Sequence, residues 1–153
     1  MKKPNLDQIK DLRSQTGAGV MDCRRALQDS EGDNEKAKKW LRQKGFQRAG
    51  KRAGRETSQG FIETYSHADG KIVSLVELLC ETDFVARTED FRRTAHEIAL
   101  QMAAMFPQNK DELLKQPYIR DASQTIQDLM SDLAGKTGEN VRIGRLARWQ
   151  IGD

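Results

Sequence analysis

The segment at residues 82–85 brings together side chains suited to recognition or reaction: Thr82, Asp83, Phe84 and Val85. Residues 75–80, directly before it, are almost continuously apolar, which is typical of a strand covered on both faces. A helical pattern begins at Thr88, just after it. We therefore expect the segment at a corner between a buried strand and a helix. There, Asp83 and Phe84 would present a charge and an aromatic wedge on a rigidly anchored turn.

Two other interpretations of this corner stay open from the residues alone. Phe84 could pack against the following helix as a hydrophobic staple, while Asp83 favours the N-terminus of that helix through its charge. A small hydrolase could use Glu77, Glu81 and Asp83, but the sequence shows no nucleophile and base that converge. Solvated carboxylates at the end of a strand explain these acids more simply.

The cysteines, the histidines and a glycine-rich turn do not indicate a metal, nucleophilic or nucleotide site. Cys23 and Cys80 lie far apart without a Cys-x-x-Cys spacing, which favours two buried thiols in a reducing compartment. His67 and His96 have no ligand-like neighbours. Residues 16–19 lack the preceding strand and the Gly-Lys-Ser/Thr ending of a phosphate loop, so they predict a turn between helices. We expect no metal, cofactor or catalytic residue.

The two parts of the chain carry charges of opposite sign. Residues 1–59 contain 15 Lys/Arg and 8 Asp/Glu, a net charge of +7, whereas residues 60–153 contain 11 and 15, a net charge of −4. This asymmetry predicts two modules, the first facing something acidic, although a solvated basic face would give the same counts. No apolar run reaches the length of a membrane span and no secretory leader opens the chain. We therefore expect a cytoplasmic protein without a membrane partner.

The first part of the chain predicts three short helices in a small domain at residues 1–45. Asp33 suits the N-cap of the third helix, and Gly45 suits its C-terminal turn. A basic linker at residues 46–59 would follow. The basic stretch at residues 44–55 could be a solvated linker or a frayed helix, which we favour, or a phosphate-binding arm. The positions expected to face inward are Ile9, Leu12, Val20, Cys23, Leu27, Ala37, Trp40 and Leu41.

Residues 60–153 predict an α+β core, a three-stranded antiparallel sheet packed with helices. A hairpin with its turn at residues 68–70 should supply two strands. A helix from Thr88, ended by Pro107, and a second over residues 121–133 should cover them. The expected helix stripes are Phe91, Ala95, Ile98, Met102 and Met105, then Ile126, Leu129, Met130 and Leu133. The third strand should face inward through Val141, Ile143, Ala147, Trp149 and Ile151, with Arg145 as an interruption.

Three stretches resemble the elongation factor Ts family, the guanine-nucleotide exchange factors of elongation factor Tu. The stretch Cys80–Arg87 contains a Thr-Asp-Phe-Val signature, residues 138–148 resemble the closing strand, and residues 12–42 are similar to the N-terminal domain. The resemblance covers essentially the whole chain, in the family's order. It implies an N-terminal domain with a ubiquitin-associated-like three-helix fold and a short, single-core form, in which a homodimer through the core could supply a second copy.

The resemblance also implies a function as an exchange factor rather than an enzyme. The protein would bind elongation factor Tu in its GDP-bound and nucleotide-free forms and release GDP by disturbing the magnesium and phosphate site, so that GTP can reload. Residues 82–85 would enter beside the magnesium site. The N-terminal domain would contact the partner through Leu12, Thr16, Gly17, Ala18, Gly19, Met21 and Asp22. A basic helical RNA-binding module is the alternative, whereas an exchange factor is expected to need no direct nucleic-acid contact.

Overall fold

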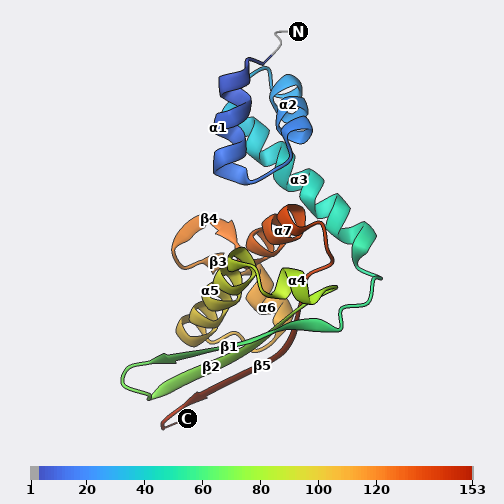
Figure 1. Cartoon of the computed structure of the whole chain (residues 1–153). Helices are drawn as coiled ribbons and strands as arrows, with labels where there is room; N and C mark the ends of the chain where they lie inside the picture. The colour runs from blue at the N-terminus through green and yellow to red at the C-terminus, as the bar shows by residue number, and fades with distance from the viewer. Residues whose placement is uncertain (1–3, 153) are drawn as a thin grey trace.

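The computed structural model describes residues 4–152 and has the expected α+β architecture (Figure 1). Its elements, in chain order, are α1 (Leu6–Thr16), α2 (Val20–Asp29), α3 (Asn34–Arg52), β1 (Gln59–His67), β2 (Ile72–Cys80), α4 (Asp83–Ala86), α5 (Glu89–Met105), α6 (Lys110–Lys115), β3 (Pro117–Tyr118), β4 (Asp121–Thr125), α7 (Ile126–Thr137) and β5 (Arg142–Gln150). The three N-terminal helices stand above a sheet that carries the remaining helices on one side.

The N-terminal helices enclose a small core of their own. Asn5 caps α1, and the Asp33 side chain caps α3 by accepting from the Lys36 amide, as the sequence predicts. Trp40 and Leu41 pack against this core and remain half-buried. Val20 was expected to face inward, but it is 47% exposed and the buried stripe of α2 is completed by Ala26 instead. The core consists of Ile9, Leu12, Cys23, Ala26, Leu27 and Ala37.

Helix α3 is longer than expected. It does not end at Gly45 but continues to Arg52, so the first half of the expected linker is helical. The physical reason is tertiary packing, because the second half of α3 lies against α7. A Cβ at position 45 would be 3.6 Å from the Ser131 carbonyl oxygen, an ordinary contact distance, which shows that α3 packs against α7 at this point. The Arg52 guanidinium also donates to the Ala134 carbonyl at 3.1 Å.

The main sheet is antiparallel with strand order β1-β2-β5, and its hairpin turn is at Ala68–Gly70, where all three residues have positive φ. One face packs against α5: Val76 and Leu78 are buried there, and the Ser74 hydroxyl donates to the Ala99 carbonyl at 2.7 Å. Thr88 caps α5, as expected. The buried stripe of α5 includes Phe91, Ala95, Ile98 and Met102, whereas Met105 was expected there and is 48% exposed.

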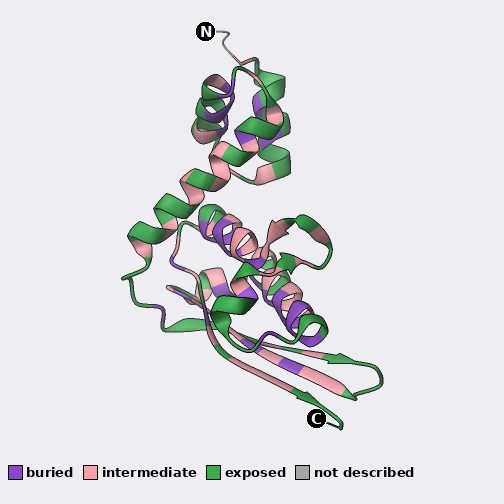
Figure 2. Ribbon diagram, turned by 180° about the vertical axis from the view of Figure 1, so that it is seen from behind, coloured by how far each residue is buried: buried purple, intermediate pink, exposed green. Residues whose placement is uncertain are grey.

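The other face of the sheet carries no layer among residues 4–152, as Figures 1 and 2 show from opposite sides. Burial in β2 alternates, with Leu75 and Leu79 only half-buried, so the expectation of a strand covered on both faces is wrong. Ile62 and Trp149 on the neighbouring strands are 52% and 64% exposed. The continuous apolar run therefore gives the sheet an apolar outer face.

A bulge in β5 overturns the simple alternation expected for that strand. Val76 pairs with Leu146 and Leu78 pairs with Ile143, so Gly144 and Arg145 both lie opposite Glu77. The extra residue reverses which side chains face the helices. Arg148 consequently lies on the α5 side, where its Nε donates to the Ala103 carbonyl at 3.1 Å. Trp149, expected inside, is turned to the outer face.

The segment between α5 and β5 also differs from the single expected helix. Residues 121–125 form strand β4, which pairs with β3, and α7 begins only at Ile126. Thr125 ends the strand and caps the helix through a capping box with Asp128. Gly135 lies within α7, and Gly138 ends it with a φ of 73°. The buried positions Ile126, Met130 and Leu133 match expectation, while Leu129 is half-buried.

Candidate functional site

The corner between β2 and α5 is a single turn of helix with its own cap. Thr82 is the N-cap of α4, and its hydroxyl accepts from the Val85 amide at 3.4 Å. Thr88, the N-cap of α5, donates its hydroxyl to the Val85 carbonyl at 2.8 Å. Two caps therefore follow one another within a few residues, which fixes the backbone of the corner on both sides. Sequence reasoning placed the corner correctly but did not predict the helical turn.

The side chains of residues 83–86 divide into anchors and exposed groups. Ala86 is buried and Val85 packs against the main core. Phe84 is 80% exposed and is not part of that core, so the staple interpretation finds no support. Asp83 lies at the N-terminus of α4 and forms an ion pair with Arg87 at 3.0 Å. The corner thus presents an aromatic ring and a carboxylate on a backbone held from behind.

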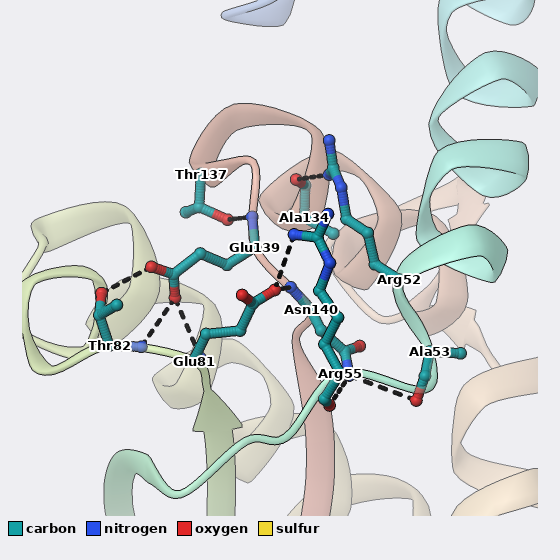
Figure 3. Close-up of polar contacts among 9 residues, drawn as sticks. All are labelled: Arg52, Ala53, Arg55, Glu81, Thr82, Ala134, Thr137, Glu139 and Asn140. Atoms are coloured by element: carbon teal, nitrogen blue, oxygen red, sulfur yellow. Dashed lines mark hydrogen bonds and ion pairs between the residues drawn. The ribbon is translucent and has the colours of Figure 1, made fainter.

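The turn after α7 holds the first residue of the corner (Figure 3). One oxygen of the Glu139 carboxylate accepts from the amides of Glu81 and Thr82, both at 3.0 Å. The other oxygen accepts from the Thr82 hydroxyl at 2.6 Å. No local pattern indicates this role, because Glu139 lies far along the chain from Thr82. Only the antiparallel pairing of β2 with β5 brings the two together.

A second carboxylate joins the same turn to the end of α3. Glu81 accepts from the Asn140 amide at 2.6 Å and pairs with Arg55 at 3.4 Å. The Asn140 N–H, reinforced by Arg55, lowers the pKa of Glu81. The Asn140 side chain donates to the carbonyls of Ala53 at 3.4 Å and Arg55 at 2.9 Å. Thus the corner, the turn and the chain leaving α3 share one hydrogen-bond network (Figure 3).

The cysteine beside the corner is chemically quiet. Cys80 is fully buried, and its thiol donates to the Thr82 carbonyl at 3.1 Å. Burial, together with the nearby Glu139 carboxylate, raises the pKa of Cys80 to about 11. The group therefore stays protonated at neutral pH, and thiolate chemistry is disfavoured. Cys23 is also buried and free, so both thiols are buried as expected.

The expected N-terminal contact residues lie in different environments. Leu12 is fully buried, so it can support a binding surface but cannot touch a partner. Thr16 and Ala18 are half-buried in the turn between α1 and α2. The pKa of Asp22 is lowered chiefly by its hydrogen bond from Arg48, and Lys44 pairs with it as well, so this acid ties α2 to α3. Gly17, Gly19 and Met21 are exposed, and so is the neighbouring Val20, which was expected to face inward.

The turn between α1 and α2 borders an open cleft of about 420 Å³ that is lined by this turn, by α3 and by α7. Gly17 has a φ of 67°, and the Lys136 side chain lies where a Cβ at that position would be. The turn follows a helix rather than a strand, which agrees with an inter-helix turn instead of a phosphate loop.

Across residues 4–152, no three acidic, histidine or cysteine side chains are grouped to hold a metal ion. His67 contacts the Tyr65 hydroxyl, while His96 contacts Glu63, so the histidines serve local contacts. None of the helices described here is long and apolar enough to cross a bilayer.

The chain is similar to known proteins over nearly its whole length. Residues 81–153 match the family model described as Elongation factor TS. Elongation factor Ts of Nitratidesulfovibrio vulgaris is 42% identical, over 94% of each chain. The proteins of the same name from Coprothermobacter proteolyticus and Thermotoga neapolitana are each 40% identical, over at least 95% of each chain. The alignment with the first relative spans 189 positions, more than the 153 residues here, so that relative has residues without a counterpart in this chain. This chain belongs to the elongation factor Ts family and is a translation elongation factor.

Proposed function

We propose that the protein binds elongation factor Tu·GDP and promotes release of GDP, after which GTP can reload. The observation that carries this proposal is the environment of Phe84. Phe84 is a large aromatic ring that is 80% exposed on a doubly capped corner. Covering this ring with a partner would remove its apolar surface from water and so favour binding. The protein would act by binding alone in the cytoplasm, without catalytic chemistry of its own.

The proposed mechanism is differential binding by the corner. A factor that binds nucleotide-free elongation factor Tu more tightly than the GDP complex weakens GDP by the same factor, since the coupling is reciprocal. Magnesium helps to hold GDP and requires near-ideal octahedral oxygen geometry. Family resemblance suggests that residues 82–85 enter beside this ion. Phe84 would wedge between side chains of the partner, and Asp83 would make polar contacts that help to displace the segment supporting magnesium.

The N-terminal helices would provide a second contact, on the nucleotide-binding domain of elongation factor Tu. The exposed Val20 and Met21 beside the turn at residues 17–19 form a small apolar surface for this contact. The basic side chains of α3 offer less support for the RNA-binding alternative. Lys38, Lys44 and Arg48 already form ion pairs within the molecule. Strong salt-dependent retention of RNA without elongation factor Tu would favour that alternative.

A homodimer through the outer sheet face is part of the proposal. Ile62 and Trp149 expose apolar surface there, next to the half-buried Leu75. A second copy would cover this face and supply the second core that a single-core chain lacks. Light scattering should then give the mass of a dimer, and Trp149→Glu should give that of a monomer. A monomeric parent protein at micromolar concentration would contradict this part alone.

The direct test of the proposed function is release of fluorescent GDP from elongation factor Tu, with and without this protein. We expect faster release with it. Calorimetry with GDP and the isolated protein serves as the control, because a factor that acts on its partner should not bind the nucleotide tightly itself. Unchanged release, or tight GDP binding by the protein alone, would overturn the proposal.

A further inference from the structure

The orientation of Phe84 depends on the start of the corner more than on its own contacts. The ring is 80% exposed and lies outside the core, so packing cannot fix it. Its position follows from the helical turn that begins at the Thr82 cap. A group that fixes Thr82 therefore also fixes the direction in which Phe84 leaves the molecule.

Glu139 is placed to do this. Its carboxylate accepts all three polar hydrogens at the start of the corner, two from successive amides and one from the Thr82 hydroxyl. Because the hydroxyl proton points to Glu139, an oxygen lone pair remains for the Val85 amide, so the contact also supports the cap of α4. Hydrogen bonds to an ionised acceptor are stronger than neutral ones.

The turn that carries Glu139 is itself fixed. Gly138 ends α7 with positive φ, and the Thr137 hydroxyl accepts from the Glu139 amide at 3.4 Å. Next in sequence, the buried Asn140 donates from its backbone to Glu81 and from its side chain to the carbonyls that follow α3. The turn therefore lies between the corner and the end of the helix that leads from the N-terminal module (Figure 3).

We propose that Glu139 is a positioning residue that fixes Thr82 and thereby aims Phe84 at the partner. Asn140 extends this role by tying the same turn to the chain leaving α3, so that the corner and the N-terminal module are presented in one arrangement. This inference rests on the proposed exchange function for its consequence, but the positioning itself can be measured on the protein alone.

The partner-free measurement is amide hydrogen exchange. In the full-length protein, Glu139→Ala should increase exchange at the amides of Glu81 and Thr82 by about tenfold or more, which corresponds to about 1.4 kcal/mol of local opening. Asp121→Ala is the matched control, since Asp121 also accepts three hydrogen bonds, from one amide and two side chains, and lies in β4. It should leave these two amides unchanged. Unaltered protection at Glu81 and Thr82 in Glu139→Ala would overturn the inference, whatever happens to GDP release.

The second measurement is a double-mutant cycle on GDP release from elongation factor Tu. Glu139→Ala alone should slow release by about tenfold, and Asp121→Ala should not. In the Phe84→Ala background, Glu139→Ala should slow release by less than about twofold, because a residue that acts through Phe84 has little left to position. If the double variant slows release by the product of the two single-variant factors, Glu139 acts independently of Phe84, and the inference is overturned.

Two further variants keep the test decisive. Glu139→Gln keeps the size and one acceptor oxygen for the two amides but loses the charge and the acceptor for the Thr82 hydroxyl, so its protection and its rate should lie between those of the parent protein and those of Glu139→Ala. If Glu139→Ala does not fold, Glu139→Asp withdraws the carboxylate by one methylene while keeping its charge, and it should show both losses. If the parent protein itself fails to speed GDP release, the proposed function fails, while the hydrogen-exchange result still decides the positioning.

Discussion

Phe84 and Phe91 lie on either side of the same turn and have opposite environments. Phe91 is fully buried in the core, whereas Phe84 is 80% exposed. The contrast separates a residue that stabilises the fold from one available to a partner. Asp83 resembles Phe84 in this respect, because it pairs with Arg87 on the surface, and such pairs contribute little to stability.

We predict that Phe84→Ala and Asp83→Ala each change the free energy of unfolding by no more than about 0.5 kcal/mol, as is usual for surface substitutions, so the melting temperature should be nearly unchanged. Phe91→Ala provides the contrast, with an expected loss of about 3–5 kcal/mol for a buried phenylalanine. Thermal unfolding by circular dichroism measures all three. If both corner variants melt at a clearly lower temperature than the parent protein, Phe84 and Asp83 stabilise the fold instead of serving a partner.

Glu81 should make stability sensitive to acid. The Asn140 N–H and Arg55 lower the pKa of Glu81 from its ordinary value of 4.5. A carboxylate with a depressed folded-state pKa stabilises the protein above its unfolded-state pKa, and that stabilisation is lost as the pH falls through the folded-state pKa. We therefore expect Glu81→Gln to lower the free energy of unfolding at pH 7 and to make its decline below pH 4.5 shallower. Urea unfolding at several pH values tests this prediction, with substitution of the exposed Glu56 (Glu56→Gln) as the control. If the free energy of unfolding changes with pH equally in the parent protein, Glu81→Gln and Glu56→Gln, Glu81 does not have this role.

At the scale of elements, local patterns predicted the starts of α3 and α5 and the hairpin, whereas long-range contacts decided where α3 ends and how β5 pairs. The side chains of Asp33 and Thr88 signal caps because they act on amides a few residues away. Gly45 signals a helix end by propensity, yet packing on α7 outweighs that preference. The β5 bulge is invisible to a period-two pattern, since it is defined by pairing across the sheet.

The same distinction applies to the candidate site. The corner at residues 82–85 could be found because a buried strand, a polar turn and a helix cap follow one another in sequence. The role of Glu139 could not be found, because its partners are reached only after β5 pairs with β2. The exposure of Val20 was missed for a related reason: the helical stripe alone does not show which edge of α2 faces α3.

Replacing either of two glycines with alanine should change the free energy of unfolding, in opposite directions. A Cβ at Gly60 would overlap the Leu78 carbonyl oxygen, so Gly60→Ala must displace the β1–β2 ladder and should cost about 1–3 kcal/mol. A Cβ at Gly50 would have nothing within 4 Å, and this position is inside α3, so Gly50→Ala should stabilise by roughly 0.5–1 kcal/mol. Denaturant unfolding measures both changes. Shifts of the same sign would contradict the described packing.

At the scale of the molecule, the chain has two separate apolar cores joined by α3. Every residue of the larger core lies beyond position 60, and every residue of the smaller core lies before position 42. The contact between the three N-terminal helices and the α+β core is made mainly by α3, which packs on α7. We propose that this division corresponds to two functional modules, a docking module and an exchange module.

Deleting residues 1–54 tests this division. The fragment keeps the larger core intact and loses contacts such as that of Arg52 with Ala134, so we expect cooperative unfolding at a somewhat lower temperature. Its GDP release activity should be much weaker, since the N-terminal surface no longer contributes affinity. Calorimetry and the release assay measure the two properties. An unfolded fragment, or one with the full rate, would show that the two modules are not separable as described.

The role of the corner is tested most directly by the magnesium dependence of GDP release from elongation factor Tu, with the parent protein compared to Phe84→Ala. If Phe84 acts by disturbing the magnesium site, the variant should be slower by about tenfold or more at abundant magnesium, as expected for an aromatic anchor worth roughly 2 kcal/mol. The difference should largely disappear when magnesium is chelated, because the ion that the corner disturbs is already gone. A normal rate at abundant magnesium, or an equal defect in both conditions, would contradict the proposed action of the corner.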